Sequence, residues 1–180
     1  KCWGSDGYGI LGNGGFNNGQ TTPVSVSLPT DRTAIAIADA GGDRDHLCVI
    51  LDNKSVNCWG DNRFGQVGDG TYTDRNTPTY VDIGGSGIAK AIIVGGYMSC
   101  AVLDDASLKC WGDILEDTGD PINTPASMSL PTGRHIDLSE RDIDGDGILN
   151  IFETTHTPGM QEGHAFSRST IATGGIDQGN

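Results

Sequence analysis

The sequence predicts an all-β fold built from repeated units, on the strength of one recurring segment and of the composition. Cys-Trp-Gly occurs at Cys2–Gly4, Cys58–Gly60 and Cys110–Gly112, with spacings of 56 and 52 residues. A period of this length, built around short strands, is typical of propellers and solenoids. The 28 glycines and 36% hydrophobic residues among 180 indicate short strands joined by turns. We therefore expect a partial or multi-chain β-propeller over residues 1–138.

Each unit is expected to contain the same order of strands and turns. The central copy is the most complete, with an extended segment at Ala34–Ala38, a hairpin at Cys48–Cys58 and a glycine-rich stretch at Trp59–Gly70. The next copy repeats this order, and the first copy retains only its end. Thr-Pro follows the glycine-rich stretch in all three copies, at Thr22-Pro23, Thr77-Pro78 and Thr124-Pro125.

The charge of the chain narrows the classes of partner. There are 24 acidic and 11 basic residues, for a net charge of −13, and no run of Lys or Arg. Nucleic-acid affinity comes largely from Lys and Arg that displace counterions from phosphates, so we expect no nucleic-acid partner. The longest weakly polar stretch, Thr33–Ala38, is far too short to span a bilayer, so no membrane insertion is expected.

The cysteines predict two disulfides. Cys48 and Cys58 lie ten residues apart, as do Cys100 and Cys110, and each pair encloses two extended halves around a polar centre. Folding each segment about its centre makes a hairpin that sets the cysteines opposite each other, with Cβ atoms about 4.5–5.5 Å apart. The repeated spacing and the low pI favour an oxidising compartment, hence an extracellular or cell-surface location. The alternative is five free buried thiols in a cytosolic protein.

Cys2 is the odd thiol of the set. By the ten-residue rule its partner would lie before Lys1, so Cys2 looks like half of a hairpin whose first strand is upstream. No signal peptide is recognisable in this chain, which begins inside a repeat and is expected to be a processed product or an internal piece. Because repeat units bury their faces against neighbours, we expect upstream blades or further copies of the same assembly to complete the propeller.

The glycine-rich stretch carries a family resemblance. Gly41–His46 and Trp59–Gly68, with Asn62 and Gly65-Gln66-Val67-Gly68, resemble the repeat of the regulator of chromosome condensation family. That family forms β-propellers, usually seven-bladed, with repeats of about this length. The resemblance covers roughly residues 1–138 and weakens after the central copy, where Met98 replaces the histidine and Asp113–Glu116 replaces the asparagine signature. The cysteine-bearing version resembles bacterial extracellular members more than the nuclear exchange factor.

We assign structural roles to the most prominent residues of the repeat. The tryptophans are expected to be core residues buried between blades, and His46 is expected to be a structural hydrogen-bonding residue. The loops Gly12–Thr22 and Asp69–Thr77 are the expected contact surfaces. Asp69 and Asp74 suggest a second metal site, but solvated loop charges explain them better.

A second motif predicts calcium binding. Asp142–Glu153 fits the twelve-residue calcium loop, with Gly147 at the sharp turn. The expected ligands are Asp142, Asp144, Asp146, the carbonyl of Ile148, Asn150 and Glu153. The alternative is a solvated acidic turn. The loop resembles those of thrombospondin type three repeats and dockerins, which implies that Ca²⁺ stiffens an extracellular module with modest affinity. Residues 139–158 are therefore expected to form this EF-hand-like loop and a short helix, and residues 159–180 a flexible Gly-rich tail or linker.

Three functions remain open from the sequence. The first is a secreted or cell-surface, non-enzymatic binding or structural protein whose propeller loops contact a protein or glycan, rigidified by Ca²⁺ and disulfides. The second is a regulatory propeller that inhibits or modulates an enzyme or GTPase, which the resemblance to exchange factors and to a β-lactamase inhibitor protein implies. The third is a non-catalytic fragment of a larger extracellular enzyme. No arrangement of Ser, His and Asp or of Cys and His carries a catalytic signature, so the chain is expected not to be an enzyme.

Overall fold

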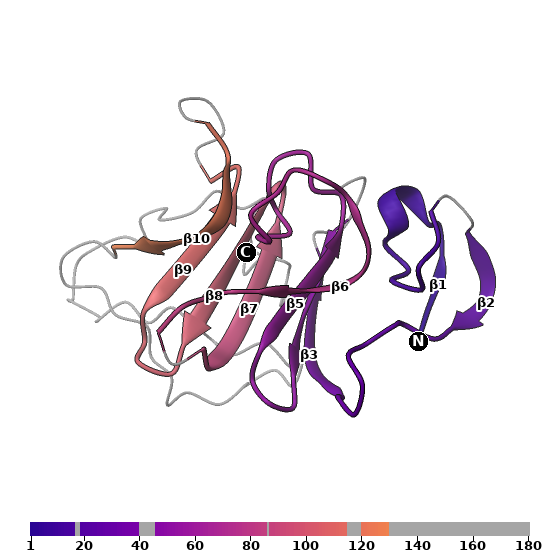
Figure 1. The fold of residues 1–180 in the computed structure, drawn as a ribbon, viewed down its shortest axis with the longest axis horizontal. Helices are drawn as coiled ribbons and strands as arrows, with labels where there is room; N and C mark the ends of the chain where they lie inside the picture. The colour runs from indigo at the N-terminus through magenta and orange to yellow at the C-terminus, as the bar shows by residue number, and fades with distance from the viewer. Residues whose placement is uncertain (17–18, 40–45, 86, 115–119, 130–180) are drawn as a thin grey trace, which may run out of the picture.

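The computed structural model describes residues 1–16, 19–39, 46–85, 87–114 and 120–129, and these residues form three antiparallel sheets (Figure 1). The first sheet has two strands and the other two have four each. The described residues contain a single short helical element, the 3-10 turn η1 (Gly7–Gly9). The fold is therefore all-β, as the sequence predicts, with the architecture of a partial propeller.

The central blade is the four-stranded sheet β3-β4-β5-β6, in which neighbours in the sheet are also neighbours in the sequence. Its strands are β3 (Ala34–Asp39), β4 (His46–Leu51), β5 (Val56–Gly60) and β6 (Arg75–Val81). β4 and β5 are buried along their whole length, which explains why their sequence is nearly continuously apolar rather than alternating. The turn between them lies at residues 52–55, where Lys54 takes a positive φ of 69°.

The third blade repeats this meander with β7 (Ala89–Gly95), β8 (Met98–Leu103), β9 (Leu108–Gly112) and β10 (Ile122–Met128). The first half-blade contains only β1 (Cys2–Gly4) and β2 (Gln20–Val24). β1 pairs with β2 as β5 pairs with β6, so the first copy supplies the second half of a blade. In Figure 1 the half-blade lies beside the central blade, on the side away from the third blade.

The largest core cluster lies between the central and third blades. The two faces of the central blade are divided by the alternation of its strands: Cys48 and Ile50 face the third blade, whereas Leu47 and Val49 face the half-blade. From the third blade the same cluster contains Ile92, Val94, Ala101, Leu103 and Trp111. Each complete blade therefore has an apolar face on both sides, as stacked repeat units require.

Several sequence predictions fall outside this description. The calcium loop at residues 142–153, the 139–158 appendage and the 159–180 tail all lie outside the described residues. The expected contact loops are shorter than predicted, because β2 begins at Gln20 and β6 begins at Arg75. β2 pairs with β1, and β6 pairs with β5. The last residues of each predicted loop therefore belong to a strand of the sheet. Within the described residues no helix has the length and apolar character needed to cross a membrane.

Candidate interaction surface

The two predicted hairpins are present and carry disulfides. Cys48 lies directly opposite Cys58 in the register of β4 and β5, and Cys100 lies opposite Cys110 in β8 and β9. Both pairs are disulfide-bonded, with Cα atoms 4.1 Å apart in each. Cys2 is the only free cysteine and is partly buried. The disulfides fix the middle of each complete blade and leave the first half-blade without one.

The blades are joined by a hydrogen bond that occurs twice in equivalent positions. The indole Nε1 of Trp59 donates to the carbonyl of Ile10, and that of Trp111 donates to the carbonyl of Gln66, at 2.8 Å in both cases. Each carbonyl belongs to the loop that leaves the preceding Cys-Trp-Gly strand, and each acceptor is eight residues after its cysteine. The loop of one blade therefore contacts the tryptophan of the next.

Glycine is required where this loop crosses the indole ring. A Cβ on Gly12 would lie 2.7 Å from Nε1 of Trp59, and a Cβ on Gly68 would lie 2.6 Å from Nε1 of Trp111. Both glycines also have a positive φ, of 65° and 80°, which side chains rarely adopt. Close approach of backbone to indole is therefore what the repeated glycine signature encodes.

Asn62 organises the loop between β5 and β6, which spans residues 61–74. Its side chain is fully buried, and its amide nitrogen donates to the carbonyls of Thr71 (3.1 Å) and Thr73 (3.0 Å). Its side-chain oxygen accepts from the backbone N–H of Val67 at 2.9 Å, and its own N–H donates to the Asp74 carboxylate at 2.9 Å. The buried side chain of Asn62 thus joins both ends of the loop, which explains why an asparagine belongs to the repeat pattern.

The loop after β1 has an equivalent anchor that the sequence analysis missed. The buried Asp6 carboxylate accepts from the backbone N–H of Leu11 at 3.1 Å, in the position where Asn62 accepts from Val67. The signal was available, since Asp6 and Asn62 both lie four residues after their cysteines. A carboxylate offers the same acceptor as the amide oxygen, so the loop survives the change of residue type.

Two arginines stabilise the carboxylates of the loop. Burial tends to raise the pKa of Asp61, but two hydrogen bonds from the Arg63 guanidinium (2.9 and 2.8 Å) lower it below its ordinary value. Burial acts in the same way on Asp69, and hydrogen bonds from Thr71 and Arg75 bring the pKa of that carboxyl below its usual range. Asp69 is therefore an ion-pair partner in this structure. Within the described part of the chain no group of three or more His, Cys, Asp or Glu side chains is arranged to hold a metal ion.

Aromatic contacts connect this loop to both neighbouring units. The guanidinium of Arg63 lies over the ring of Tyr8 in the first half-blade, 4.7 Å from its centroid. On the other side, the rings of Phe64 and Tyr97 lie 4.5 Å apart, and Tyr97 belongs to the turn between β7 and β8. The loop is thus supported from both sides, which fixes where Arg63 points.

Tyr72 extends this surface towards the third blade. Its hydroxyl donates to the carbonyl of Pro121 at 2.8 Å, and half of its surface (50%) remains exposed. We call the surface formed by Tyr8, Arg63, Phe64, Tyr72 and Tyr97 the loop face. The loop between β5 and β6, which carries three of these residues, leaves the sheet at the end opposite the hairpin turn at residues 52–55, and it is seen towards the top of Figure 1.

The predicted structural role of His46 is confirmed. Its Nε2 is 3.0 Å from the hydroxyl of Ser99, which in turn donates to the carbonyl of Gln66 at 2.9 Å. Burial lowers the pKa of His46 to about 4, and the nearby Asp61 opposes that shift only in part. His46 belongs to β4 and Ser99 to β8, so their hydrogen bond joins the central and third blades. Both residues are completely buried, so the pair is not accessible to a substrate.

One tryptophan departs from the prediction. Trp59 and Trp111 are buried between blades, with 1% and 0% of their surface exposed, but Trp3 is 63% exposed. The expectation that all three are core residues is therefore wrong for Trp3. The neighbours that cover the other two rings come from the preceding unit, and within the described residues no unit precedes the half-blade.

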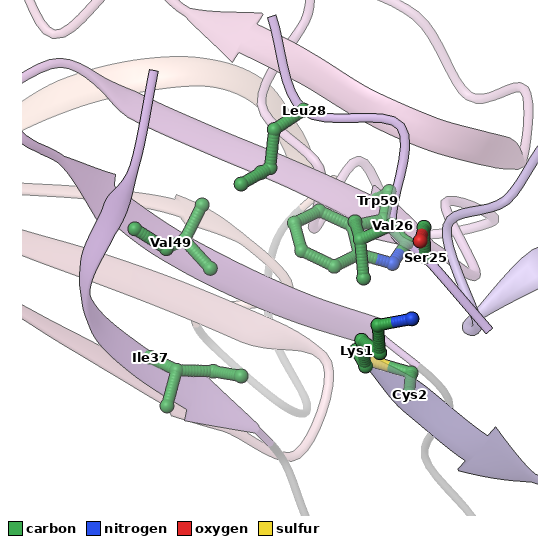
Figure 2. Close-up of a pocket in the computed structure, with 9 residues that line it drawn as sticks. Lys1, Cys2, Ser25, Val26, Leu28, Ile37, Val49 and Trp59 are labelled. Atoms are coloured by element: carbon green, nitrogen blue, oxygen red, sulfur yellow. The ribbon is translucent and has the colours of Figure 1, made fainter. Parts of the chain in front are cut away.

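An apolar groove of about 300 Å³ lies between the half-blade and the central blade (Figure 2). Its lining includes Cys2, Val26, Leu28, Ile37, Val49 and Trp59. In Figure 2 the side chains of Val26, Leu28 and Val49 surround the Trp59 ring, and Lys1 and Cys2 lie at one end. The groove and the loop face are separate surfaces.

The sheets, the inter-blade indole contacts and the repeated loops define a class of protein, the β-propellers built from long repeats. Residues 38–66 and 55–102 each match the regulator of chromosome condensation (RCC1) repeat. The predicted resemblance is confirmed for these residues.

Known proteins with similar sequences are much longer than this chain. The E3 ubiquitin-protein ligase HERC2 of Mus musculus is 31% identical over 111 residues, and the ultraviolet-B receptor UVR8 of Arabidopsis thaliana is 29% identical over 109. Each alignment covers 61% of this chain, but only 2% of HERC2 and 23% of UVR8. The chain thus spans a small part of these relatives.

Solved structures show the same fold. Human WBSCR16 superimposes with a TM-score of 0.59 at 22% identity, over 72% of this chain and 34% of that protein. Prp20p of Saccharomyces cerevisiae superimposes with a TM-score of 0.62 at 18% identity, over 74% of this chain and 35% of Prp20p. These likenesses establish the propeller fold of the described blades.

Proposed function

We propose that this chain is a non-enzymatic, protein-binding part of a β-propeller, and that its loop face makes the partner contact. The observation that carries the proposal is the pre-ordered loop at residues 61–74, which presents Arg63 and Tyr72 at the surface. Tyr and Arg are enriched among the residues that dominate binding energy at protein interfaces. Side chains already held in place lose less conformational entropy on binding.

The known relatives support a protein partner. Prp20p of Saccharomyces cerevisiae has been characterised for its binding to Gsp1p and histones, and a yeast RCC1 structure has Kap60 bound. Those partners belong to those proteins, and the likeness to this chain extends to the fold alone. The partner proposed here is a protein with an acidic or hydrogen-bonding group for Arg63 and an apolar surface for Tyr72.

Paired variants at opposite ends of the blades test this proposal. Arg63→Ala with Tyr72→Ala alters the loop face, while Lys54→Ala with Asp105→Ala alters the exposed turns of the two hairpins. Quantitative cross-linking capture should recover a specific protein with the wild type and the hairpin variant, and at least tenfold less with the loop-face variant. Equal recovery by both variants, with unchanged circular dichroism, would contradict the role of the loop face.

We further propose that the protein works outside the cytosol. The two disulfides support this location, since disulfides persist in oxidising compartments and are rare in the cytosol. The mass of the native protein, alkylated without reduction, should show one free thiol. Five alkylated cysteines would contradict the proposed compartment.

Ca²⁺ binding at Asp142–Glu153 is proposed from sequence alone. The register of Asp142, Asp144, Asp146 and Glu153 matches the hard oxygen ligands that calcium requires. Calorimetric titration should give a dissociation constant on the order of 10⁻⁴–10⁻³ M, typical of extracellular modules. Glu153→Gln should abolish the heat change, whereas Glu162→Gln outside the motif should leave it intact. An unchanged isotherm for Glu153→Gln would remove the assignment.

A further inference from the structure

The turn between β4 and β5 carries a short motif that occurs once in the sequence. Asn53-Lys54-Ser55 has the pattern Asn-x-Ser/Thr with a residue other than proline in the middle. This pattern is the acceptor for N-linked glycosylation, which occurs on surface loops of secreted proteins. Each of the other asparagines lacks Ser or Thr two residues later. Because so short a pattern also arises by chance, the structure of the turn has to decide whether it can act.

The turn presents both side chains that the pattern requires. Asn53 is exposed and Ser55 is half-buried. The Ser55 hydroxyl donates to Oδ1 of Asn53 at 2.8 Å, and the Ser55 backbone N–H donates to the same oxygen at 3.2 Å. Among the described residues no hydrogen bond engages Nδ2 of Asn53. The amide nitrogen is thus available for modification, and the hydroxyl of the motif lies beside the same amide group.

Backbone hydrogen bonds hold the turn in place without the amide nitrogen. The Lys54 N–H donates to the carbonyl of Leu51 at 2.8 Å, and the N–H of Asp52 donates to the carbonyl of Thr33 at 2.8 Å. The carbonyl of Lys54 accepts from the N–H of Ala89 in the third blade at 3.0 Å. A sugar on Nδ2 of the asparagine would break none of these bonds, so the modification is compatible with the folded blade.

The hairpin turn of the third blade shows that the turn does not need an asparagine. Asp105 and Ser107 occupy the places of Asn53 and Ser55, five and seven residues after the first cysteine of the hairpin. The Ser107 N–H donates to the Asp105 carboxylate at 2.9 Å, which repeats the bond that the Ser55 N–H makes to Asn53. A carboxylate and an amide offer the same acceptor oxygen. What Asn53 adds to the central blade is therefore the nitrogen, which is the atom that glycosylation modifies.

We propose that Asn53 is a site of N-linked glycosylation, and this proposal rests on the location outside the cytosol proposed above. The donor class is a sugar linked through its anomeric carbon to a lipid pyrophosphate. A bond forms between Nδ2 and the anomeric carbon while the bond from that carbon to the pyrophosphate oxygen breaks. The pyrophosphate leaves with the bonding electrons, and one proton of the amide passes to a base of the transferase. No oxidation or reduction takes place.

The sugar would lie at the end of the central blade opposite the loop between β5 and β6. β4 ends at Leu51 and β5 begins at Val56, whereas that loop leaves the other end of β5 after Gly60. An attached glycan is bulky and solubilising, so it keeps other proteins away from the hairpin end. Glycosylation at Asn53 therefore directs protein contacts towards the loop face.

The full chain, secreted behind a signal peptide from a eukaryotic cell, tests the site. Mass spectrometry of the peptide that contains Asn53 should show a glycan that peptide N-glycosidase removes with conversion of the asparagine to aspartate. Ser55→Ala should reduce occupancy about tenfold or more, because it removes the hydroxyl of the motif, whereas Ser55→Thr should retain the glycan. Asp105→Asn should gain a second glycan, because Ser107 is already in place in an equivalent turn.

Asn53→Asp separates loss of the acceptor from loss of the fold. The carboxylate keeps the turn, as Asp105 does in the third blade, so this variant should be secreted at the wild-type level and carry no glycan. An unmodified Asn53 in a secreted wild-type chain with both disulfides formed would overturn the proposal. That result would leave the proposed location standing, because the location depends on the thiol count of the native protein and not on the glycan.

Discussion

The two junctions between blades share a hydrogen bond from a tryptophan indole but differ in the size of their apolar clusters. At both, a tryptophan indole donates to a loop carbonyl at 2.8 Å, and a glycine lies against the ring. The junction of the central and third blades also contains a large buried cluster, to which both blades contribute their first two strands. The junction with the half-blade contains a smaller cluster and an open groove.

This difference shows that each interface has two parts, the loop and indole contacts and the apolar contacts between strands. The loop and indole contacts depend only on the Cys-Trp-Gly strand and the residues after it, so they form even where half a blade is present. The apolar layer of the complete junction also draws on the first two strands of the preceding unit, through Ala36, Ala38, Cys48 and Ile50. We infer that the indole contact sets the spacing of neighbouring units and that the strand contacts supply most of the burial, which is the larger source of stability.

The largest expected loss of stability comes from the tryptophans, which occupy the same position in the three copies of the repeat but differ in burial. Trp111→Ala should lower the free energy of unfolding by about 3–5 kcal/mol, because it removes a fully buried ring and leaves a cavity. Trp59→Ala should cost a similar amount. Trp3→Ala should change stability by at most about 0.5 kcal/mol, as for an exposed site. Urea denaturation measures all three, and equal losses at Trp3 and Trp111 would show that burial against a preceding unit does not set the contribution of the ring.

A glycine series tests the indole contact itself. Gly68→Ala should cost roughly 2–4 kcal/mol, since its Cβ would collide with the Trp111 ring at a positive φ. Gly84→Ala is the matched control, because its φ is also positive but nothing lies within 4 Å of the added Cβ. It should cost about 1 kcal/mol, because a side chain disfavours the left-handed backbone conformation. If the two variants unfold at the same urea concentration, crowding against the indole has no part in stability.

The burial of His46 between the complete blades makes their junction sensitive to pH, because burial lowers the pKa of the imidazole. Because the folded pKa is about 4 and the ordinary value 6.5, the unfolded chain binds the proton more readily. Stability is therefore complete above pH 6.5 and decreases as the pH falls towards 4, by on the order of 2–3 kcal/mol. His46→Gln should flatten this dependence when unfolding is measured at pH 7 and pH 4.5. A variant with the wild-type pH dependence would mean that other groups cause it.

The disulfides should give the smallest of these effects. Replacing Cys48 and Cys58 together by Ser should cost roughly 2–3 kcal/mol, as expected for a link closing a loop of about ten residues. Cys2→Ser is the matched control and should be nearly neutral, since Cys2 is free. Thermal unfolding with and without reductant provides the measurement. A reductant effect of the same size on the double variant would assign it to the Cys100–Cys110 link instead.

Much of the fold could be predicted because its signals are local. The ten-residue cysteine spacing contained both hairpins and their register, and the Cys-Trp-Gly period located the blades. Asp6 could have been identified as the counterpart of Asn62 by aligning the first copy with the central one, since each lies four residues after its cysteine. The sequence could not show the exposure of Trp3, because burial of that ring depends on a neighbouring unit rather than on its own repeat.

The sequence by itself determined the strands and the hairpin pairing, since these follow from contacts between residues that are near each other in the chain. Only the tertiary structure decided how units meet. The Arg63–Tyr8 contact, the His46–Ser99 bond and the groove at Ile37 all join different repeats. Because the repeated units have similar sequences, they form the same local structure. The environment of an individual side chain therefore depends on which neighbouring unit packs against it.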